Sequence, residues 1–284
     1  MVRTQVLMML NRLFKAPVHP FNLQKKEGKS YALWQYEKGG ETLKFFQKKY
    51  TQNMMLKNKT VVDIGCGPAG KSLYFASHGA KKVYGVDMLE QYKKESMKLA
   101  EKLGVKDRFE FVSCDSTRLP FPDGFADTII LNNTMEHLAD PEKSLTEMER
   151  ILSKNGRIYI NFPPYYHPSG AHLTDAVFIP WVHLLFSDKV LIEAYKKLVS
   201  GLPDGESRIK FRISKRDDGT EYFSYINKMT VKRFRQIVKE LDMKPVYYEE
   251  VPLRPYLLLL ARIPVIKEMF IRTVVCVFEK KNER

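Results

Sequence analysis

The chain has 284 residues and carries 47 Lys and Arg against 33 Asp and Glu, which gives a formal net charge of +14. A hydrophobic fraction of 44% excludes a wholly disordered chain. Three scattered cysteines, none in a CxxC pair, exclude a disulfide scaffold and a zinc ribbon, and they fit a reducing compartment.

Two further exclusions concern membranes and export. The sequence has no run of the roughly 18 apolar residues that a membrane-spanning helix needs. The apolar run Val6–Leu10 is too short for the core of a signal peptide, and no small-residue cleavage site follows it. We therefore expect a cytoplasmic protein.

The basic excess is confined to the two flanks of the chain. Residues 1–60 carry a net charge of +9, residues 61–165 carry −1, and residues 166–284 carry +6. A surface for nucleic acid or for an anionic membrane is one explanation, and a solvated basic surface is the other.

Residues 1–58 are predicted to form a helical arm. Apolar residues between Val2 and Leu13 recur at spacings near three and four, which is typical of an amphipathic helix. A second helix is expected over Glu41–Tyr50.

Residues 59–162 alternate short β-branched runs with helical patterns. The expected strands are Thr60–Ile64, Lys82–Val86, Arg108–Ser113, Phe125–Leu131 and Arg157–Phe162. The expected helices are Ser72–His78, Leu89–Leu103 and Pro141–Leu152. Strands separated by helices imply right-handed crossovers and a parallel sheet covered on both faces.

The alternation breaks in residues 163–227, which we interpret as an insertion that caps the substrate. It holds a predicted helix, Lys189–Leu198, and a charged, turn-rich stretch, Gly201–Gly219. Residues 228–284 return to the core with helix Val231–Leu241 and strands Pro245–Val251 and Arg272–Glu279. The predicted fold is α/β, with a doubly wound, mostly parallel sheet and an antiparallel last strand.

A glycine loop follows the first predicted strand. Residues Gly65–Gly70 form a GxGxxG pattern between a strand and a helix, and the acid Asp87 ends the next strand. Glycines let the backbone turn sharply and let a ligand approach, and an acid at that place can accept both hydroxyls of a ribose. The candidate ligands are a dinucleotide and S-adenosylmethionine.

Four features favour S-adenosylmethionine. Asp63 lies inside the first strand, where a carboxylate suits an ammonium and a sulfonium better than a pyrophosphate. Asp115 follows the third strand, where it can accept from an adenine amino group. The loop comes after a helical arm, and no ordinary helical crossover joins the last two strands.

Three segments carry a family resemblance. Val61–Gly67 (VVDIGCG) resembles the first motif of class I S-adenosylmethionine-dependent methyltransferases. Met135–Pro141 (MEHLADP) resembles the "leHl.dP" stretch of the broad branch that includes the ubiquinone/menaquinone C-methyltransferases. Glu149–Arg157 is similar to that branch's "RvLkpgG" segment, with Asn155 in place of the usual glycine. The resemblance implies a Rossmann-like fold and S-adenosyl-L-methionine as cofactor.

The resemblance also implies roles for individual residues. Gly65 and Gly67, with Cys66 between them, would pass close to the methionine part of the cofactor, and Asp63 would anchor its ammonium directly or through water. The remaining contacts are Asp87 to the ribose, Met88 packing on the adenine, Asp115 and Ser116 at the adenine edge, and the carbonyl of Asn132 facing the ammonium. For Met88 a place in the hydrophobic core is the alternative.

Methyl transfer from a sulfonium is an in-line displacement, so the protein supplies mainly positioning and exclusion of water. A general base is needed only where the acceptor must lose a proton. The candidates are His137, His167, His172 and Tyr165, and we expect His167 or His172 to contact the acceptor. No metal ligands are predicted.

Two apolar segments bear on the substrate: residues 252–266, and Phe178–Phe186 in the insertion. The first could be a buried helix, a lid over an apolar acceptor, or a segment lying in a membrane interface. Beside basic flanks, the pair favours a methyltransferase (EC 2.1.1.-) acting on a small, hydrophobic or lipid-like acceptor, with peripheral contact to an anionic membrane. The alternatives are a nucleic-acid methyltransferase, an NAD-binding oxidoreductase and a non-catalytic binding scaffold.

Overall fold

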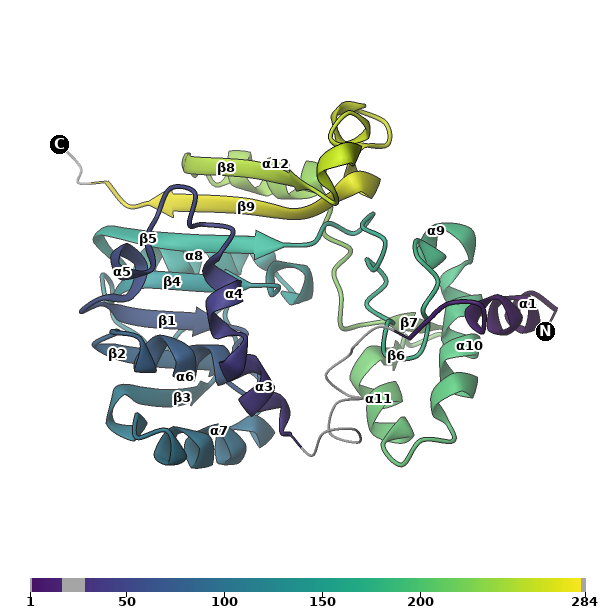
Figure 1. Cartoon of the computed structure of the whole chain (residues 1–284), viewed down its shortest axis with the longest axis horizontal. Helices are drawn as coiled ribbons and strands as arrows, with labels where there is room; N and C mark the ends of the chain where they lie inside the picture. The colour runs from purple at the N-terminus through teal and green to yellow at the C-terminus, as the bar shows by residue number, and fades with distance from the viewer. Residues whose placement is uncertain (1, 17–28, 282–284) are drawn as a thin grey trace.

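A computed structural model describes residues 2–16 and 29–281. Its centre is a seven-stranded sheet in the order β3-β2-β1-β4-β5-β9-β8 (Figure 1). The strands are β1 (Thr60–Ile64), β2 (Lys82–Asp87), β3 (Phe109–Ser113), β4 (Ala126–Asn132), β5 (Leu152–Phe162), β8 (Pro245–Pro252) and β9 (Ile271–Glu279). The five strands predicted for the first half of the chain are all present.

Strand directions confirm the predicted fold class. β1 lies between β2 and β4 and runs parallel to both, whereas β9 runs antiparallel to β5 and to β8. The chain therefore reverses its winding between β1 and β4. In such sheets, ligands bind at the carboxyl ends of the strands beside this reversal.

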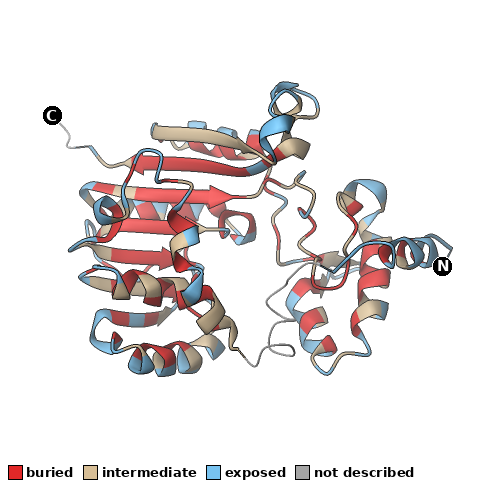
Figure 2. Cartoon of the chain, in the orientation of Figure 1, coloured by how far each residue is buried: buried red, intermediate tan, exposed pale blue. Residues whose placement is uncertain are grey.

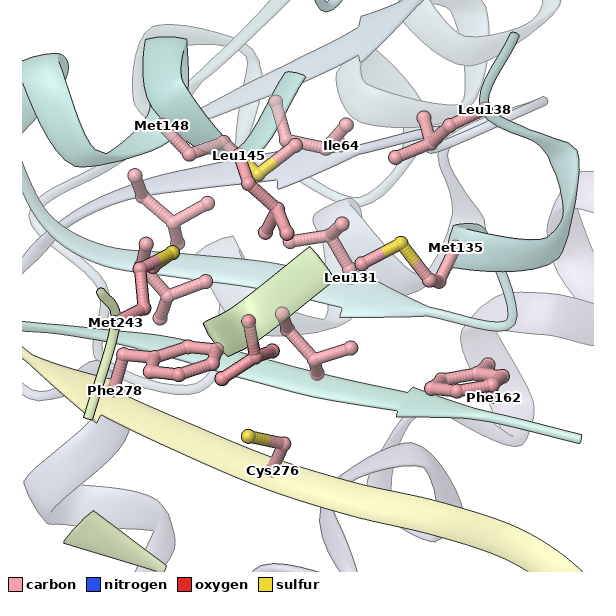
Figure 3. Packing of buried hydrophobic residues seen from close by; sticks show 14 of the residues in the cluster. Ile64, Leu131, Met135, Leu138, Leu145, Met148, Phe162, Met243, Cys276 and Phe278 are labelled. Atoms are coloured by element: carbon pink, nitrogen blue, oxygen red, sulfur yellow. The ribbon is translucent and has the colours of Figure 1, made fainter. Parts of the chain in front are cut away.

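Helices cover both faces of the sheet, and each face has its own hydrophobic core. Helices α8 (Pro141–Ile151) and α12 (Val231–Glu240) pack on one face, where Leu131, Leu145 and Met148 meet (Figure 3). The other face carries α3 (Tyr31–Glu37), α4 (Gly39–Leu43), α5 (Gln52–Leu56), α6 (Gly70–Ser77) and α7 (Gln91–Lys102).

Local sequence explains several helix and loop boundaries. The Asp140 side chain accepts a hydrogen bond from the Lys143 amide at the start of α8, and Pro141 occupies the first helical position. Asn155 has a φ of 60°, in the left-handed region that asparagine tolerates, so it can replace the glycine of the family segment.

The cap forms a separate body beside the carboxyl edge of the sheet (Figures 1 and 2). It holds α9 (Val182–Leu185), α10 (Asp188–Val199), α11 (Gly205–Arg212) and a hairpin of β6 (Ile213–Lys215) and β7 (Glu221–Phe223). Its hydrophobic core includes the fully buried Leu7 of α1 (Val2–Asn11). The first helix of the arm thus packs on the cap, whereas α3 and α4 pack on α6 in the core.

Two secondary-structure predictions were wrong. The helix expected over Glu41–Tyr50 ends at Leu43, and turns follow, because Phe46 and Tyr50 both pack edge-on against Tyr159 of β5. The stretch expected to be turns, Gly201–Gly219, contains α11.

The α11 helix was not predicted because its arginines pair with a buried acid that is distant in the sequence. Arg208 and Arg212 are each 3% exposed, and both bind the buried carboxylate of Asp175 at 3.2 and 3.0 Å. Their charges therefore hold α11 against the rest of the cap, whereas the sequence predicted a charged, turn-rich stretch here.

The apolar segment between β8 and β9 is exposed, so its interpretation as a buried helix was wrong. It forms three short 3₁₀ turns with no buried residue: Pro255–Leu257, Leu260–Arg262 and Lys267–Phe270. A hydrogen bond of 2.7 Å from the Leu253 amide to the Phe270 carbonyl closes its base. Among the described residues, no helix combines the length and the apolar character that crossing a bilayer requires.

Close packing of α3 on α6 gives a stability prediction. A Cβ added at Gly70 would lie 2.0 Å from the Ala32 carbonyl oxygen of α3. We expect Gly70→Ala to lower the free energy of unfolding by about 1–3 kcal/mol, measured by urea denaturation. The control Gly201→Ala meets no atom within 4 Å and should change it by less than about 0.5 kcal/mol. Equal stability of both variants would contradict this packing.

Candidate functional site

A cavity of about 830 Å³ lies at the carboxyl ends of β1, β2 and β4. One wall is the loop between β1 and α6, and another is the segment that follows β4. The cap supplies the opposite wall through residues near 163–174, the end of α11 and Tyr225. Core and cap thus enclose one continuous space.

The glycine loop owes its path to two glycines in the left-handed region. Gly65 has a φ of 69°, and a Cβ there would lie 2.3 Å from the Thr134 side chain. Gly67 has a φ of 55° and open space where its Cβ would be. Gly67 therefore leaves room on the cavity side for a ligand to touch the backbone.

Asp87, at the end of β2, holds this loop in place. Its carboxylate accepts hydrogen bonds from the Gly67 amide at 2.8 Å and the Leu89 amide at 2.9 Å. Burial raises the pKa of Asp87, and the two amides oppose that shift. One oxygen thus binds the glycine loop, and the other binds the segment that follows β2. Asp87 also lines the cavity, where the prediction places a ribose.

Asp63 lies behind the cavity wall. It is 3% exposed and accepts a hydrogen bond of 2.5 Å from the Ser72 hydroxyl of α6. Burial raises the pKa of Asp63 to about 6, although Ser72 and the nearby Lys71 act against that shift. The carboxylate is therefore poised to change its charge just below neutral pH.

Lys71 is a cavity residue that sequence reasoning missed. Its ammonium donates a hydrogen bond to the Asn132 side chain at the end of β4, and Asn132 in turn donates to Asn161 at 2.7 Å. Burial lowers the pKa of Lys71, and the charges of Asp63 and Glu136 oppose this. A single lysine after a glycine loop carries no signal of its own in the sequence.

The structure separates the other predicted cofactor residues into two groups. Met88, Asp115 and Ser116 line the cavity with Gly65, Gly67, Asp87 and Asn132. Met88 is 67% exposed, so its interpretation as a core methionine was wrong. Cys66 is buried and does not line the cavity, and burial raises the pKa of its thiol.

Three of the four predicted catalytic residues line the same cavity: His137, His167 and His172. The rings of His137 and His172 meet edge-on with centroids 4.9 Å apart. Burial lowers the pKa of His167 to about 4, so its imidazole is neutral at neutral pH. Tyr165 does not line the cavity, because its ring packs against Tyr166 and His183.

Glu136 is a second residue that sequence reasoning missed. It lines the cavity beside His137, is 3% exposed, and burial raises its pKa to about 8. The MEHLADP segment contained the signal for Glu136, because the acid stands next to His137, which was already a candidate catalytic residue.

The arm and the cap complete the cavity. Tyr31 and Gln35 of α3 line it, and the Gln35 side chain accepts from the Gly70 amide at 3.2 Å. In the cap, the Tyr225 hydroxyl donates to the carbonyls of Ala171 and His172 at 2.6 and 2.5 Å. Both walls are therefore fixed by hydrogen bonds to backbone.

Comparison with known proteins agrees with the sequence resemblance. Residues 62–160 match the family model described as "Methyltransferase domain". The probable chloroplastic tocopherol O-methyltransferase of Oryza sativa is 33% identical over 104 residues, which are 37% of this chain and 29% of the relative. The demethylmenaquinone methyltransferase of Thermus thermophilus is 31% identical over 115 residues, 40% of this chain and 50% of the relative. The chain thus spans half or less of these relatives' lengths.

Solved structures show the same fold at low sequence identity. The MccD protein has a TM-score of 0.53 at 17% identity, with 85% of this chain and 96% of that chain covered. The PH0226 protein of Pyrococcus horikoshii has a TM-score of 0.53 at 19% identity, with coverages of 87% and 92%. Together with the sheet order, these matches confirm the Rossmann-like methyltransferase fold.

S-adenosylmethionine is the cofactor that the domain match implies, and the residues present fit it. Gly67 leaves open space that a Cβ would fill, and Asp87 offers a carboxylate beside it. Lys71 brings a positive charge to the cavity, and Asp63 brings a negative charge from just behind its wall. The methionine end of the cofactor carries an ammonium and a carboxylate, which these two charges complement.

Asp63 gives a pH prediction. Because Asp63 holds its proton more tightly in the folded protein than in the unfolded chain, its ionisation lowers stability as pH rises from about 4 towards 6. The ionised form is the one that attracts the ammonium. We therefore expect calorimetric affinity for S-adenosylmethionine to rise between pH 5 and pH 7, on the order of tenfold.

Asp63→Asn should remove that pH dependence, weaken binding at pH 7 and raise the melting temperature at pH 7 relative to wild type. The control Asp127→Asn lies at the opposite end of the sheet, where its carboxylate accepts from the Thr60 amide. Its cofactor affinity should follow the wild-type pH profile. An unchanged profile in Asp63→Asn would contradict the assignment.

Proposed function

We propose that this protein is an S-adenosylmethionine-dependent methyltransferase that acts on a small, hydrophobic or lipid-like acceptor. The observation that carries the proposal is one continuous cavity, which runs from the glycine loop of the core to histidines from both the core and the cap. The cofactor and the acceptor can therefore share one enclosed space.

The cofactor supplies a methyl group already activated by a positively charged sulfur. The chain's own residues would bind and orient it: the Gly67 backbone and Lys71 line the cavity, and Asp87 beside them would hold the ribose. Asp63, buried behind the wall, would act on the ammonium of the methionine end through its charge. The cap covers the open side and excludes water, so competition from hydrolysis is reduced.

The acceptor half of the cavity combines apolar surface with ionisable groups. Leu138 and Phe211 line it together with His137, His167 and His172. Tocopherol and demethylmenaquinone, which the names of two relatives specify, are lipophilic molecules with polar ring groups. An acceptor of that kind suits this lining, because apolar contacts hold its body and the histidines meet its polar group.

We further propose that the protein meets its acceptor at an anionic membrane surface. The segment between β8 and β9 exposes Tyr256, Leu259 and Val265 at 79%, 73% and 92%, with the exposed Arg254 and Arg262 beside them. Apolar side chains flanked by cations suit the boundary between acidic headgroups and acyl chains.

The cap adds to this surface. Trp181 packs against Phe270 at the base of the segment, with ring centroids 6.2 Å apart, and the following helix α9 exposes Leu185 at 66%. The apolar segment of the cap therefore meets the base of the segment between β8 and β9. A cytoplasmic location with peripheral membrane contact is part of the proposal, and the free thiols of all three cysteines support it.

The activity is tested by calorimetry with S-adenosylmethionine, followed by transfer of labelled methyl groups to a lipid extract. Wild type should bind one cofactor and label a species extractable into organic solvent. Asp87→Asn should lose most of both signals, whereas the control Asp107→Asn, on the 3₁₀ turn before β3, should retain both. Label entering RNA would favour the nucleic-acid alternative, and no binding heat would leave a scaffold.

The membrane surface is tested by flotation with vesicles that contain anionic lipid. Wild type should float at low salt and less at high salt, because salt screens the cations. The double variant Leu259→Ser and Val265→Ser should float poorly. The control Met54→Ser, at a 45% exposed methionine of α5, should float as wild type does. Failure of wild type to float would overturn the membrane proposal and leave the activity untouched.

A further inference from the structure

Three metal-ligating side chains converge in the cavity from two bodies of the molecule. Glu136 and His137 follow β4 in the core, and His172 comes from the cap. One ligand atom from each lies within 4.8 Å of the other two, and the His172 Nε2 atom is 4.0 Å from a Glu136 carboxylate oxygen. Small side-chain rotations would bring all three atoms to one ion.

The Glu136 carboxylate lacks the partners that a buried acid needs. It is 3% exposed, and neither of its oxygens has a hydrogen-bond partner among the described residues. A buried polar group left without a partner costs free energy, so such groups in native proteins call for a ligand, ion or water. The cavity beside Glu136 is the place from which a ligand can reach it.

The His137 ring is oriented by a backbone carbonyl of the cap. The His137 Nδ1 atom lies 2.6 Å from the Tyr225 carbonyl oxygen, so Nδ1 carries the proton and Nε2 keeps its lone pair. Such a hydrogen bond from the second ring nitrogen to a carbonyl is the usual way in which a metal-binding histidine is held.

His172 is held in a conformation that few residues adopt. Its φ is 52°, in the left-handed region, and the Tyr225 hydroxyl donates to its carbonyl oxygen. Strain of this kind persists where the surroundings enforce it, and it gathers at functional sites. Tyr225 thus holds the His137 ring through its carbonyl and the His172 backbone through its hydroxyl.

We propose that Glu136, His137 and His172 bind a divalent first-row transition-metal ion on the acceptor side of the cavity. Two imidazoles and one carboxylate form a donor set that suits Zn²⁺, Fe²⁺, Mn²⁺ or Co²⁺ and leaves coordination positions open. Mg²⁺ and Ca²⁺ prefer oxygen ligands alone and should bind weakly.

The role of the ion rests on the proposed function. An open coordination position would take a hydroxyl oxygen of the acceptor and lower its pKa, so that the proton leaves to water. The oxygen lone pair then forms the bond to the methyl carbon while the carbon–sulfur bond breaks and its electron pair stays on sulfur. The acceptor class is therefore a phenol or enediol, methylated on oxygen.

The metal site is tested on the full chain by titration with Co²⁺, followed by visible absorption, and by calorimetry with Zn²⁺ and Mg²⁺. Wild type should bind one Co²⁺, with Zn²⁺ tighter and Mg²⁺ much weaker. Glu136→Gln and His172→Ala should each weaken Co²⁺ binding by more than about 100-fold. Losing a residue that only supports a metal ligand typically costs about 10- to 100-fold, and these two residues are ligands themselves. The control His167→Ala removes a histidine of the same cavity outside the group and should bind Co²⁺ as wild type does.

Calorimetry with S-adenosylmethionine on the same variants shows that they are folded, because the cofactor half of the cavity is intact. Absence of a Co²⁺ signal in wild type, or equal Co²⁺ affinity in Glu136→Gln and His172→Ala, would overturn the metal site. Normal Co²⁺ binding with no cofactor heat in wild type would overturn the proposed function and leave the metal site standing. Full methyl transfer after removal of metal by a chelator would overturn the role in catalysis.

Discussion

The hydrogen bond from the Gly67 amide to the Asp87 carboxylate ties the end of β1 to the end of β2, and the shape of the cavity depends on it. The parallel pairing of the two strands brings these groups to the same edge of the sheet. Gly65 must pass close to Thr134, so the loop is also fixed from the side of β4. Because the loop is held on both sides, the open side of Gly67 faces the cavity.

Much of the core could be predicted from sequence because its signals are local. β-branched runs ended by glycine, and helices begun by Asp140 and Pro141, leave little choice of structure. The amphipathic stripe of α1 predicts a buried face, but its period is the same whether that face packs on the core or on the cap. The helix α11 was missed because burial of Arg208 depends on an acid 33 residues away.

The candidate site divides in the same way. Residues inside the glycine motif or at strand ends, such as Gly67 and Asp87, were found because the motif fixes their place. Lys71 and Glu136 were missed because their importance comes from burial and from neighbours brought in by folding. Tyr165 was overestimated for the complementary reason: proximity in sequence to His167 did not place it on the cavity wall.

The two hydrogen bonds of Tyr225 have a consequence for how a fold of this kind can diversify. Glu136 and His137 lie within residues 62–160, which match the methyltransferase domain model, whereas His172 and Tyr225 belong to a cap with its own hydrophobic core. A lineage that exchanged this cap for another would lose His172 and the carbonyl that orients His137 in one event, while the cofactor half stayed whole. The choice of acceptor and the groups that act on it would then change in the same evolutionary step.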